Sequence, residues 1–320
     1  MKISYFSDGS PDPSPVISGD GDSWFRISDI APEIPLTSII DILSYEKGNP
    51  GLLSQRMESP PQPAVPVKMS TAPPILPFQP KSYRDFMLYE QHAIDAARGF
   101  VHKYFPKLRP VVSVYEKVFG KTFPKLKPHK RWYQYPIYYL GNHLNFVTHG
   151  AVIAIPQYTR ELDYELEIGI VICKMLKNAT PQEALEAIGG FVVFNDFSAR
   201  DVQLDEIRCG FGPMKAKNFA NAVSNIVVTA DEILPDIDNL KVSVSINGKQ
   251  VAENSTAGMH YTLAEAISYA SWEEQLYPGE FFGSGTVPGC TGIENWHFLK
   301  SGDTIRLEIE KVGVLENTVA

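Results

Sequence analysis

From residue 135 to the C-terminus, the chain is a succession of short segments in which apolar side chains alternate with polar ones or run continuously. A period of two places the apolar side chains on one face of a strand, so each segment predicts a strand. Asn247-Gly248 predicts a tight hairpin turn between two of them. Helical patterns interrupt only at TPQEALEAIG and TLAEAISYAS, each opened by a threonine cap. We therefore expect a strand-dominated α+β fold, with strands from the segments GAVIAIP, YELEIGIVIC, IGGFVVFNDFS, NIVVTA, KVSVSINGKQV, GEFFGSGTV and DTIRLEIEKVGVLENTV.

Proline is concentrated in the first quarter of the chain. Of the 25 prolines, 14 lie in residues 1–80, and they are densest in residues 59–80. Successive prolines exclude a helix and remove strand hydrogen-bond donors, so we expect a linker or an extended strap there. Before it, residues 37–45 show the apolar spacing of a short helix. Residues 1–58 are therefore expected to form a small N-terminal module, or else a poorly ordered tail, ahead of a main domain at 81–320.

The main domain is expected to open with a helix and a basic insert. Residues 90–104 place apolar side chains three to four residues apart, as an amphipathic helix does. Residues 103–131 then carry nine lysines and arginines against a single acid. The insert, taken as 103–134, is predicted to be either a solvated loop or a lid that covers a site and attracts an anion. Its aromatic residues favour a segment that packs on the body of the protein.

Composition excludes several classes of partner. The 320 residues carry a net charge of −8, which argues against a nucleic-acid partner. No apolar run approaches the ~18–20 residues of a membrane span, and the N-terminus reaches Asp, Gly and Pro before a signal-peptide core could form. The three cysteines lack CxxC spacing, which argues against a disulfide framework and against a thiolate zinc site. We expect a cytoplasmic protein with neither nucleic acid nor membrane as partner.

Three acids alternate along one predicted strand. Asp163, Glu165 and Glu167 share one face of the strand, while the intervening apolar residues share the other. Like charges so close repel one another, and the strand continues into buried sequence, so a compensating cation is needed. A hard divalent ion with oxygen ligands would supply it. The alternative is an ordinary solvated strand face.

A second group of polar residues follows the next buried strand. Asp196 stands at the strand end, and Arg200 and Gln203 lie four and seven residues further on. In a helical turn all three would project to one side. An acid for a metal, a guanidinium for a carboxylate and an amide for a carbonyl would suit a small oxo-acid substrate. The alternative is a surface Asp–Arg pair.

A histidine lies in the predicted helix 90–104. His92 and Asp95 are three residues apart, so the carboxylate could orient the imidazole and raise its basicity. A surface contact is the alternative for this pair as well.

Together, these segments carry a family resemblance. Asp85…His92, Glu165-x-Glu167, Asn195-Asp196-x-x-Ala199-Arg200-Asp201-x-Gln203, Lys217 and Gly283-Ser284-Gly285-Thr286 occur in the order and register of the fumarylacetoacetate hydrolase family. The chain resembles this family over roughly residues 80–320. The resemblance implies a mixed β-sandwich or β-roll catalytic domain and a homodimer. It also implies a Mg²⁺ ion, with Mn²⁺ or Ca²⁺ as alternatives, held by Glu165, Glu167, Asp196 and, as a fourth acid, Asp85.

The resemblance also assigns roles around the metal. His92 matches the catalytic histidine, Lys217 and Arg200 match positions that hold an oxyanion and a carboxylate, and the remaining substrate contacts are Gln203, Tyr139 and Thr286. Two departures stand out. Met87 replaces a substrate-contacting tyrosine, and the segment after Thr286 shows no obvious counterpart of the glutamate that partners the histidine in fumarylacetoacetase. Asp95 is therefore expected to orient His92.

The resemblance implies enolate chemistry on a small anionic substrate. We expect a metal-dependent hydrolase that cleaves a C–C bond in a β-dicarbonyl or acylpyruvate-type oxo acid through a metal-stabilised enolate. The alternatives are a decarboxylase, tautomerase or dehydratase of a β-keto acid or polyketide-like metabolite at the same metal site. A remote alternative is a non-catalytic metal-binding interaction protein.

Overall fold

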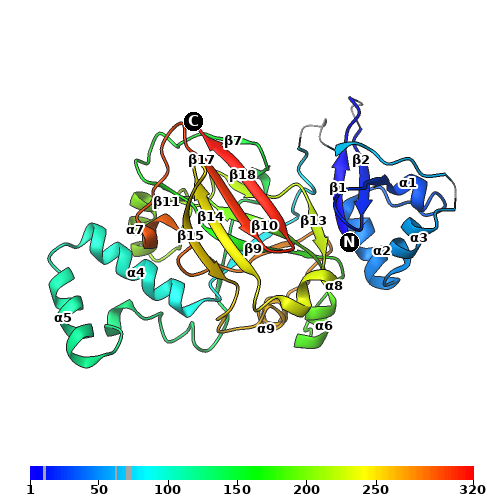
Figure 1. The fold of residues 1–320 in the computed structure, drawn as a ribbon. Coiled ribbons are helices and arrows are strands. Elements are labelled where there is room, and N and C mark those ends of the chain that lie inside the picture. The colour runs from blue at the N-terminus through cyan, green and yellow to red at the C-terminus, as the bar shows by residue number, and fades with distance from the viewer. Residues whose placement is uncertain (10–11, 62, 70–73) are drawn as a thin grey trace.

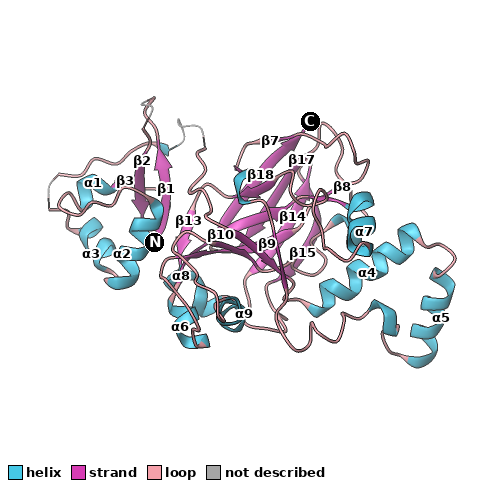
Figure 2. Cartoon of the chain, turned by 180° about the vertical axis from the view of Figure 1, so that it is seen from behind, coloured by secondary structure: helices cyan, strands magenta, loops and turns pink. Residues whose placement is uncertain are grey.

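The computed structural model describes residues 1–9, 12–61, 63–69 and 74–320, and it confirms the strand-dominated α+β class (Figures 1 and 2). A large mixed sheet runs in the order β3-β2-β1-β13-β10-β9-β16-β4-β5, with β12 and β6 attached beside β10. A second sheet, β15-β14-β17-β18-β7, lies against it where β17 and β18 meet β10. The expected mixed β-sandwich is therefore present.

The elements have the following bounds. The strands are β1 (Lys2–Phe6), β2 (Ser14–Ser18), β3 (Phe25–Arg26), β4 (Tyr83–Phe86), β5 (Tyr138–Leu140), β6 (Phe146–Thr148), β7 (Val152–Ile153), β8 (Leu162–Asp163), β9 (Leu166–Ile172), β10 (Ile188–Asp196), β11 (Ser198–Ala199), β12 (Asn221–Val223), β13 (Val227–Thr229), β14 (Lys241–Ile246), β15 (Lys249–Ser255), β16 (Phe281–Gly283), β17 (Thr304–Ile309) and β18 (Gly313–Val319). The α-helices are α1 (Ile27–Ile30), α2 (Ile39–Gly48), α3 (Leu52–Glu58), α4 (Glu90–Tyr104), α5 (Arg109–Phe119), α6 (Pro181–Glu186), α7 (Arg200–Arg208), α8 (Ala230–Ile233), α9 (Leu263–Ala270) and α10 (Gly292–Asn295).

Local sequence signals are confirmed where they were strongest. Helix α4 covers the residues predicted for it, and α6 and α9 begin after Thr180 and Thr262, whose hydroxyls accept the backbone N–H three residues on. Asn247 and Gly248 have φ of 53° and 75°, the left-handed backbone that a tight hairpin requires, and they join β14 to β15.

The N-terminal module shares its sheet with the main domain. Strand β1 pairs antiparallel with β13, with Lys2 opposite Val228. Helix α2 buries Ile39 and Ile42 in the apolar cluster that also contains Phe281 of β16. In Figure 1 the module, drawn in blue, forms one end of the molecule. The boundary at residue 58 therefore divides the chain but not the sheet.

The proline-rich strap at 59–80 is described only in part, because residues 62 and 70–73 lie outside the described residues. On its described part, Val67 forms an isolated bridge with Trp24. Phe78 is buried with its ring 6.1 Å from that of Phe281. These contacts tie the middle and the C-terminal end of the strap to the folded body.

The basic insert contacts the body of the protein through a few buried side chains, while most of its residues are exposed. Helix α5 forms within it, and Val112 and Leu126 bury their side chains against Ile94 of α4. Figures 1 and 2 show α5 beside the outer end of α4, at the opposite end of the molecule from the N-terminal module. The insert thereby brings its residues 125–132 alongside α4, where a cavity opens.

Two central strands carry polar residues into the core. Every residue of β9 and β10 is buried, because the sheet is covered on both faces. Glu167 of β9 and Asp196 of β10 therefore enter the protein interior as part of otherwise apolar strands.

Among the helices of the described residues, none combines the length and the apolar character that a membrane span needs.

Candidate active site

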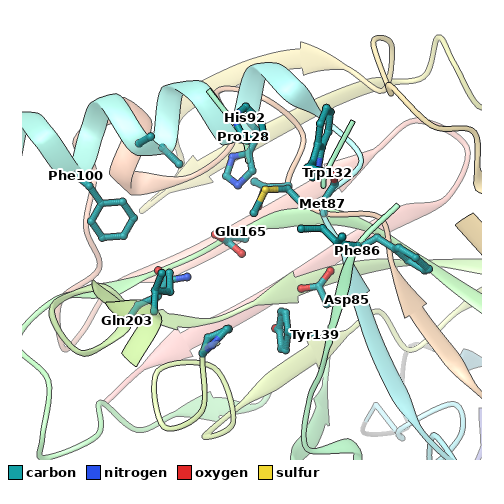
Figure 3. Close-up of a pocket in the computed structure, with 18 of the residues that line it drawn as sticks. Asp85, Phe86, Met87, His92, Phe100, Pro128, Trp132, Tyr139, Glu165 and Gln203 are labelled. Carbon is teal, nitrogen blue, oxygen red and sulfur yellow. The ribbon is translucent and has the colours of Figure 1, made fainter. Parts of the chain in front are cut away.

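A cavity of about 440 Å³ lies between α4, the insert, α7 and the ends of the central strands. Figure 3 shows His92 projecting from α4 toward it, with Glu165 facing the histidine and Asp85 and Tyr139 on the far wall. The cavity brings together most of the predicted site residues; those that line it are Asp85, His92, Tyr139, Glu165, Glu167, Arg200, Gln203, Lys217 and Thr286. Asp196 lies just behind this lining.

Three acids form a buried cluster beside the cavity. One carboxylate oxygen each from Asp85, Glu167 and Asp196 lies within 4.8 Å of the others. They come from three strands of the same sheet, β4, β9 and β10. Asp85 Oδ1 is buried and has no hydrogen-bond partner among the described residues. Hard oxygen donors, close spacing and an unpartnered carboxylate oxygen together fit a divalent cation such as Mg²⁺.

Burial governs the electrostatics of this cluster. It raises the pKa of all three carboxyls, and repulsion from Asp85 raises the pKa of Glu167 further, whereas the Lys217 ammonium opposes the rise at Asp85 and Asp196. Three ionised carboxylates packed together would repel one another strongly in a poorly hydrated site. The cluster therefore needs either protons or a cation.

The metal-free protein is expected to lose stability as pH rises above the ordinary carboxyl pKa, about 4, and through the raised pKa values of the cluster. A carboxyl whose folded-state pKa is raised stabilises the fold below its unfolded pKa, near 4, and that contribution disappears as pH climbs through the raised value. A divalent cation reverses this because it binds the ionised form. Melting temperatures in EDTA and in excess Mg²⁺ should differ more at pH 8 than at pH 5.5. An equal difference at both would contradict the raised pKa values.

A glycine makes room for the acid cluster. Gly283 of β16 lies between β9 and β4, and a Cβ there would stand 2.5 Å from Asp85 Oδ1 and 2.6 Å from Glu167 Oε2. The next turn also requires glycine, because Gly285 has φ of +80° and its N–H donates to Glu167 Oε2 at 2.9 Å. The GSGT segment thus allows two carboxylates to approach each other and orients one of them.

Gly283→Ala is expected to weaken Mg²⁺ affinity by about tenfold or more, because displaced ligands commonly cost that much. The matched control is Gly48→Ala, where an added Cβ meets nothing within 4 Å and affinity should not change. Isothermal titration of Mg²⁺ into both variants measures the effect. Wild-type affinity in the Gly283 variant would show that the cluster does not hold the ion.

Glu165 is held differently from the other acids. Arg200 Nη2 donates to Glu165 Oε1 at 2.6 Å, and Lys217 Nζ donates to Glu165 Oε2 and, at 2.5 Å, to Asp196 Oδ2. Burial raises the pKa of Glu165, but the two cations, Arg200 first, outweigh it and leave this pKa lowered. Glu165 therefore joins the acid cluster through Lys217, and its expected metal contact stays a prediction.

Arg200 is committed to protein partners. Its Nε donates to Asp163 Oδ2 at 2.6 Å, its Nη1 to Gln203 at 2.8 Å, and its Nη2 to Glu165 and to Thr291. Asp163, expected on the same strand face as the acids, accepts this bond outside the cavity lining. A substrate carboxylate would have to replace one of these bonds. Arg200 lines the cavity and supports Glu165 and Gln203, and its expected contact with a substrate carboxylate stays a prediction.

His92 pairs with an acid that the sequence did not indicate. Its Nδ1 lies 2.5 Å from Glu294 Oε1 of α10, and both side chains are buried. Glu294 Oε2 accepts the N–H of Gly289 at 2.5 Å. A carboxylate on Nδ1 keeps a proton there and leaves Nε2 as the nitrogen that can accept one. We call His92 and Glu294 the dyad.

The expected His92–Asp95 contact is wrong. Asp95 accepts hydrogen bonds from Gln91 and Arg98 of its own helix, because the Arg98 guanidinium is a stronger local partner than the imidazole. The glutamate counterpart thought to be missing after Thr286 is Glu294. Thr291-Gly292-Ile293-Glu294 has the T-x-x-E pattern of a helix start, a signal that could have located it.

The remaining predicted residues meet the cluster or the cavity. Tyr139 donates to Asp196 Oδ2 at 2.7 Å, and Tyr83, which the sequence did not single out, donates to Asp85 Oδ2 at 3.1 Å. Burial, and then the nearby acids, raise the pKa of both phenols well above the ordinary value, so they remain donors. Thr286 Oγ1 is buried at the cavity with no partner among the described residues, which leaves it available to a ligand.

Comparisons with known proteins agree with this site. Residues 117–320 match the model of the fumarylacetoacetate (FAA) hydrolase C-terminal domain. The chain is 31% identical over 188 residues to an uncharacterised protein of Methanocaldococcus jannaschii, covering 58% of this chain and 73% of that protein. It is 35% identical over 170 residues to the oxaloacetate tautomerase Fahd2a of Rattus norvegicus, a mitochondrial protein, covering 52% of this chain and 53% of that one.

A solved structure extends the likeness to the whole fold. The fumarylacetoacetate hydrolase of Exiguobacterium antarcticum superposes with a TM-score of 0.67 at 20% identity, covering 100% of this chain and 99% of that one. The chain thus spans about half the length of its rat relative in sequence, yet the full length of the bacterial fold. This chain belongs to the fumarylacetoacetate hydrolase family of enzymes.

Proposed function

We propose that the protein is a Mg²⁺-dependent hydrolase that cleaves a C–C bond in a small β-dicarbonyl or acylpyruvate-type oxo acid. The observation that carries the proposal is the buried dyad: His92 lines one side of the cavity, Glu294 holds it from behind, and Asp85 and Glu167 of the acid cluster line the other side. A histidine oriented by a carboxylate is an efficient general base for a water molecule. Hydrolysis requires such a base, and a structural metal site does not.

The residues that would hold the ion are Asp85, Glu167 and Asp196, with Glu165 linked to them through Lys217. A divalent cation, when bound, polarises a carbonyl oxygen and stabilises negative charge on it. Lys217 is an ammonium at this position, because attraction from Asp196 and Glu165 outweighs its burial and raises its pKa. It can therefore donate hydrogen bonds to a substrate oxygen.

The dyad and Thr286 define the proposed steps carried out by the protein. His92 Nε2 removes a proton from water while Glu294 holds Nδ1, and the water oxygen bonds to the acyl carbonyl carbon. The C–C bond then breaks, its electron pair stays with the enolate carbon, and the His92 proton passes to that carbon. The products are a carboxylic acid and a 2-oxo acid. Thr286 Oγ1 is available to donate to the substrate carboxylate.

Tautomerisation is a second candidate, and the rat relative's name favours it. The same dyad would move one proton between carbon and oxygen of a β-keto acid, with no water consumed and no bond between carbons broken. Decarboxylation and dehydration share this enolate. The reacting head of the substrate is in each case a small anionic oxo acid or dicarbonyl, and the expected homodimer and cytoplasmic location remain predictions.

One assay distinguishes the candidates. Purified protein with Mg²⁺ is incubated with acetylpyruvate and, separately, with oxaloacetate enol. The proposal expects stoichiometric acetate and pyruvate from the first. Rapid loss of enol absorbance with no acetate from acetylpyruvate would assign tautomerisation instead, and no turnover of either would contradict both candidates.

A further inference from the structure

One side of the cavity contains no acid and is lined by small and apolar side chains. On α4, His92, Ala96 and Phe100 follow at intervals of four residues and so share a helix face. Eight residues of helix extend about 12 Å from the imidazole at a ~1.5 Å rise per residue. In Figure 3, Phe100 lies on one side of His92, whereas Trp132, Phe86 and Asp85 lie on the other. The cavity therefore continues past the dyad, away from the acid cluster.

The walls of this extension come from three segments. We call it the apolar arm; the residues that line it are Ala93, Ala96, Ala97, Phe100, Leu126 and Ile207. Leu126 belongs to the insert and is fixed by its packing against Ile94, so the arm is a built surface. The charged residues of the insert that line the cavity, Lys125 and Lys127, are exposed at its rim.

The arm has room because alanines occupy the helix face. Three of its four α4 positions carry only a methyl group, where leucine would be equally compatible with a helix. Gln203 is the polar side chain that Figure 3 shows on the same side of the cavity as Phe100, at the edge of the arm. A polar group placed beyond its reach, among the alanines, would lose its hydrogen bonds to water without replacement. An alkyl or aryl group there would instead be withdrawn from water. The exposed lysines at the rim favour an anion overall.

We propose that the oxo-acid substrate carries an extended apolar acyl group that lies in the apolar arm while its dicarbonyl head lies between the dyad and the acid cluster. The orientation of the head rests on the proposed function, but the binding preference does not require turnover. Ile207, about half exposed at the outer end, leaves the arm open there. Affinity should therefore rise with chain length without a sharp limit.

The test uses inert oxo-acid mimics. N-methyl-, N-butyl- and N-octyl-oxamate are titrated calorimetrically into the Mg²⁺-loaded protein. We expect affinity to rise about fourfold per methylene, the fold-change that corresponds to ~0.8 kcal/mol for each CH₂ buried. Dissociation constants that do not change from methyl to octyl would overturn the proposal.

Variants locate the effect in the arm. Ala96→Leu fills it, and the octyl-to-methyl affinity ratio is expected to fall at least tenfold. Ile207→Asn, at a half-exposed position that tolerates polarity, should lower the same ratio if the leucine variant fails to fold. Gln91→Leu is the matched control, since Gln91 is an exposed residue of the same helix outside the cavity lining. An unchanged ratio in both arm variants would overturn the proposal.

Turnover separates this inference from the proposed function. If octanoylpyruvate and acetylpyruvate are both left intact while the oxamate gain persists, the hydrolase assignment fails and the arm stands. If acetylpyruvate is hydrolysed but neither oxamate affinity nor kcat/KM increases with chain length, the arm fails and the hydrolase stands.

Discussion

Glu167→Gln is expected to lower kcat/KM by about 10³ or more, and EDTA should do the same to the wild-type protein. Glu167 accepts the Gly285 N–H and lies within 4.8 Å of two further buried acids, so the amide replaces one charged oxygen donor of the cluster. Loss of carbonyl polarisation by a metal costs several kcal/mol, and each ~1.4 kcal/mol is tenfold in rate. Turnover of acetylpyruvate and of oxaloacetate enol, with Mg²⁺ restored stepwise, measures the effect.

The control for this variant is Glu186→Gln, an exposed acid on α6 that should leave activity unchanged. Mg²⁺ titration should show a lower affinity for Mg²⁺ in the Glu167 variant than in the wild type, and an unchanged affinity in the Glu186 control. Full activity in metal-free wild-type protein would sink the metal-dependent proposal, whatever the variants do.

Glu294→Gln and His92→Asn are each expected to reduce kcat by about 10²–10⁴, the usual contribution of a positioned general base. The amide cannot hold the imidazole as a carboxylate does, and asparagine has no ring nitrogen to accept a proton. Oxamate affinity should stay within a few fold, because neither residue belongs to the acid cluster. Single-turnover rates with acetylpyruvate, together with calorimetry, separate the two quantities.

Asp95→Asn tests whether Asp95 contributes to orienting the His92 imidazole. Its carboxylate contacts Gln91 and Arg98 and not His92, so kcat should change less than about threefold. A loss equal to that of Glu294→Gln would show that Asp95, and not Glu294, orients the imidazole. Melting temperatures of the variants exclude a simple folding defect.

Sequence was sufficient where a signal was local. The α4 bounds, the Asn247-Gly248 hairpin and the capped helices α6 and α9 depend on neighbouring residues, and the structure confirms them. Of the clustered acids, Glu167 was found from the period-two spacing, Asp196 from its place at a strand end, and Asp85 from the family resemblance alone. These features need no knowledge of the tertiary fold.

Pairings across long stretches of chain could not be predicted in this way. Glu294 is 202 residues from His92, and the T-x-x-E pattern that marks its helix start does not indicate which residue it will contact. The four protein acceptors of Arg200 could not be predicted either. Three of them, Asp163, Glu165 and Thr291, are distant in the sequence and meet the guanidinium only in the folded protein. Likewise, nothing near Lys2 indicates its pairing with Val228.

The shared sheet determines what happens if the first 80 residues are removed. Strand β13 would lose β1 and present unpaired backbone N–H and C=O groups beside Val227, which packs in one apolar cluster with residues of the N-terminal module. A bare, apolar strand edge is a template for pairing with other chains. A fragment that begins at residue 81 would keep every acid of the cluster and the dyad, yet it should self-associate and precipitate, and a minimal catalytic unit must therefore retain β1.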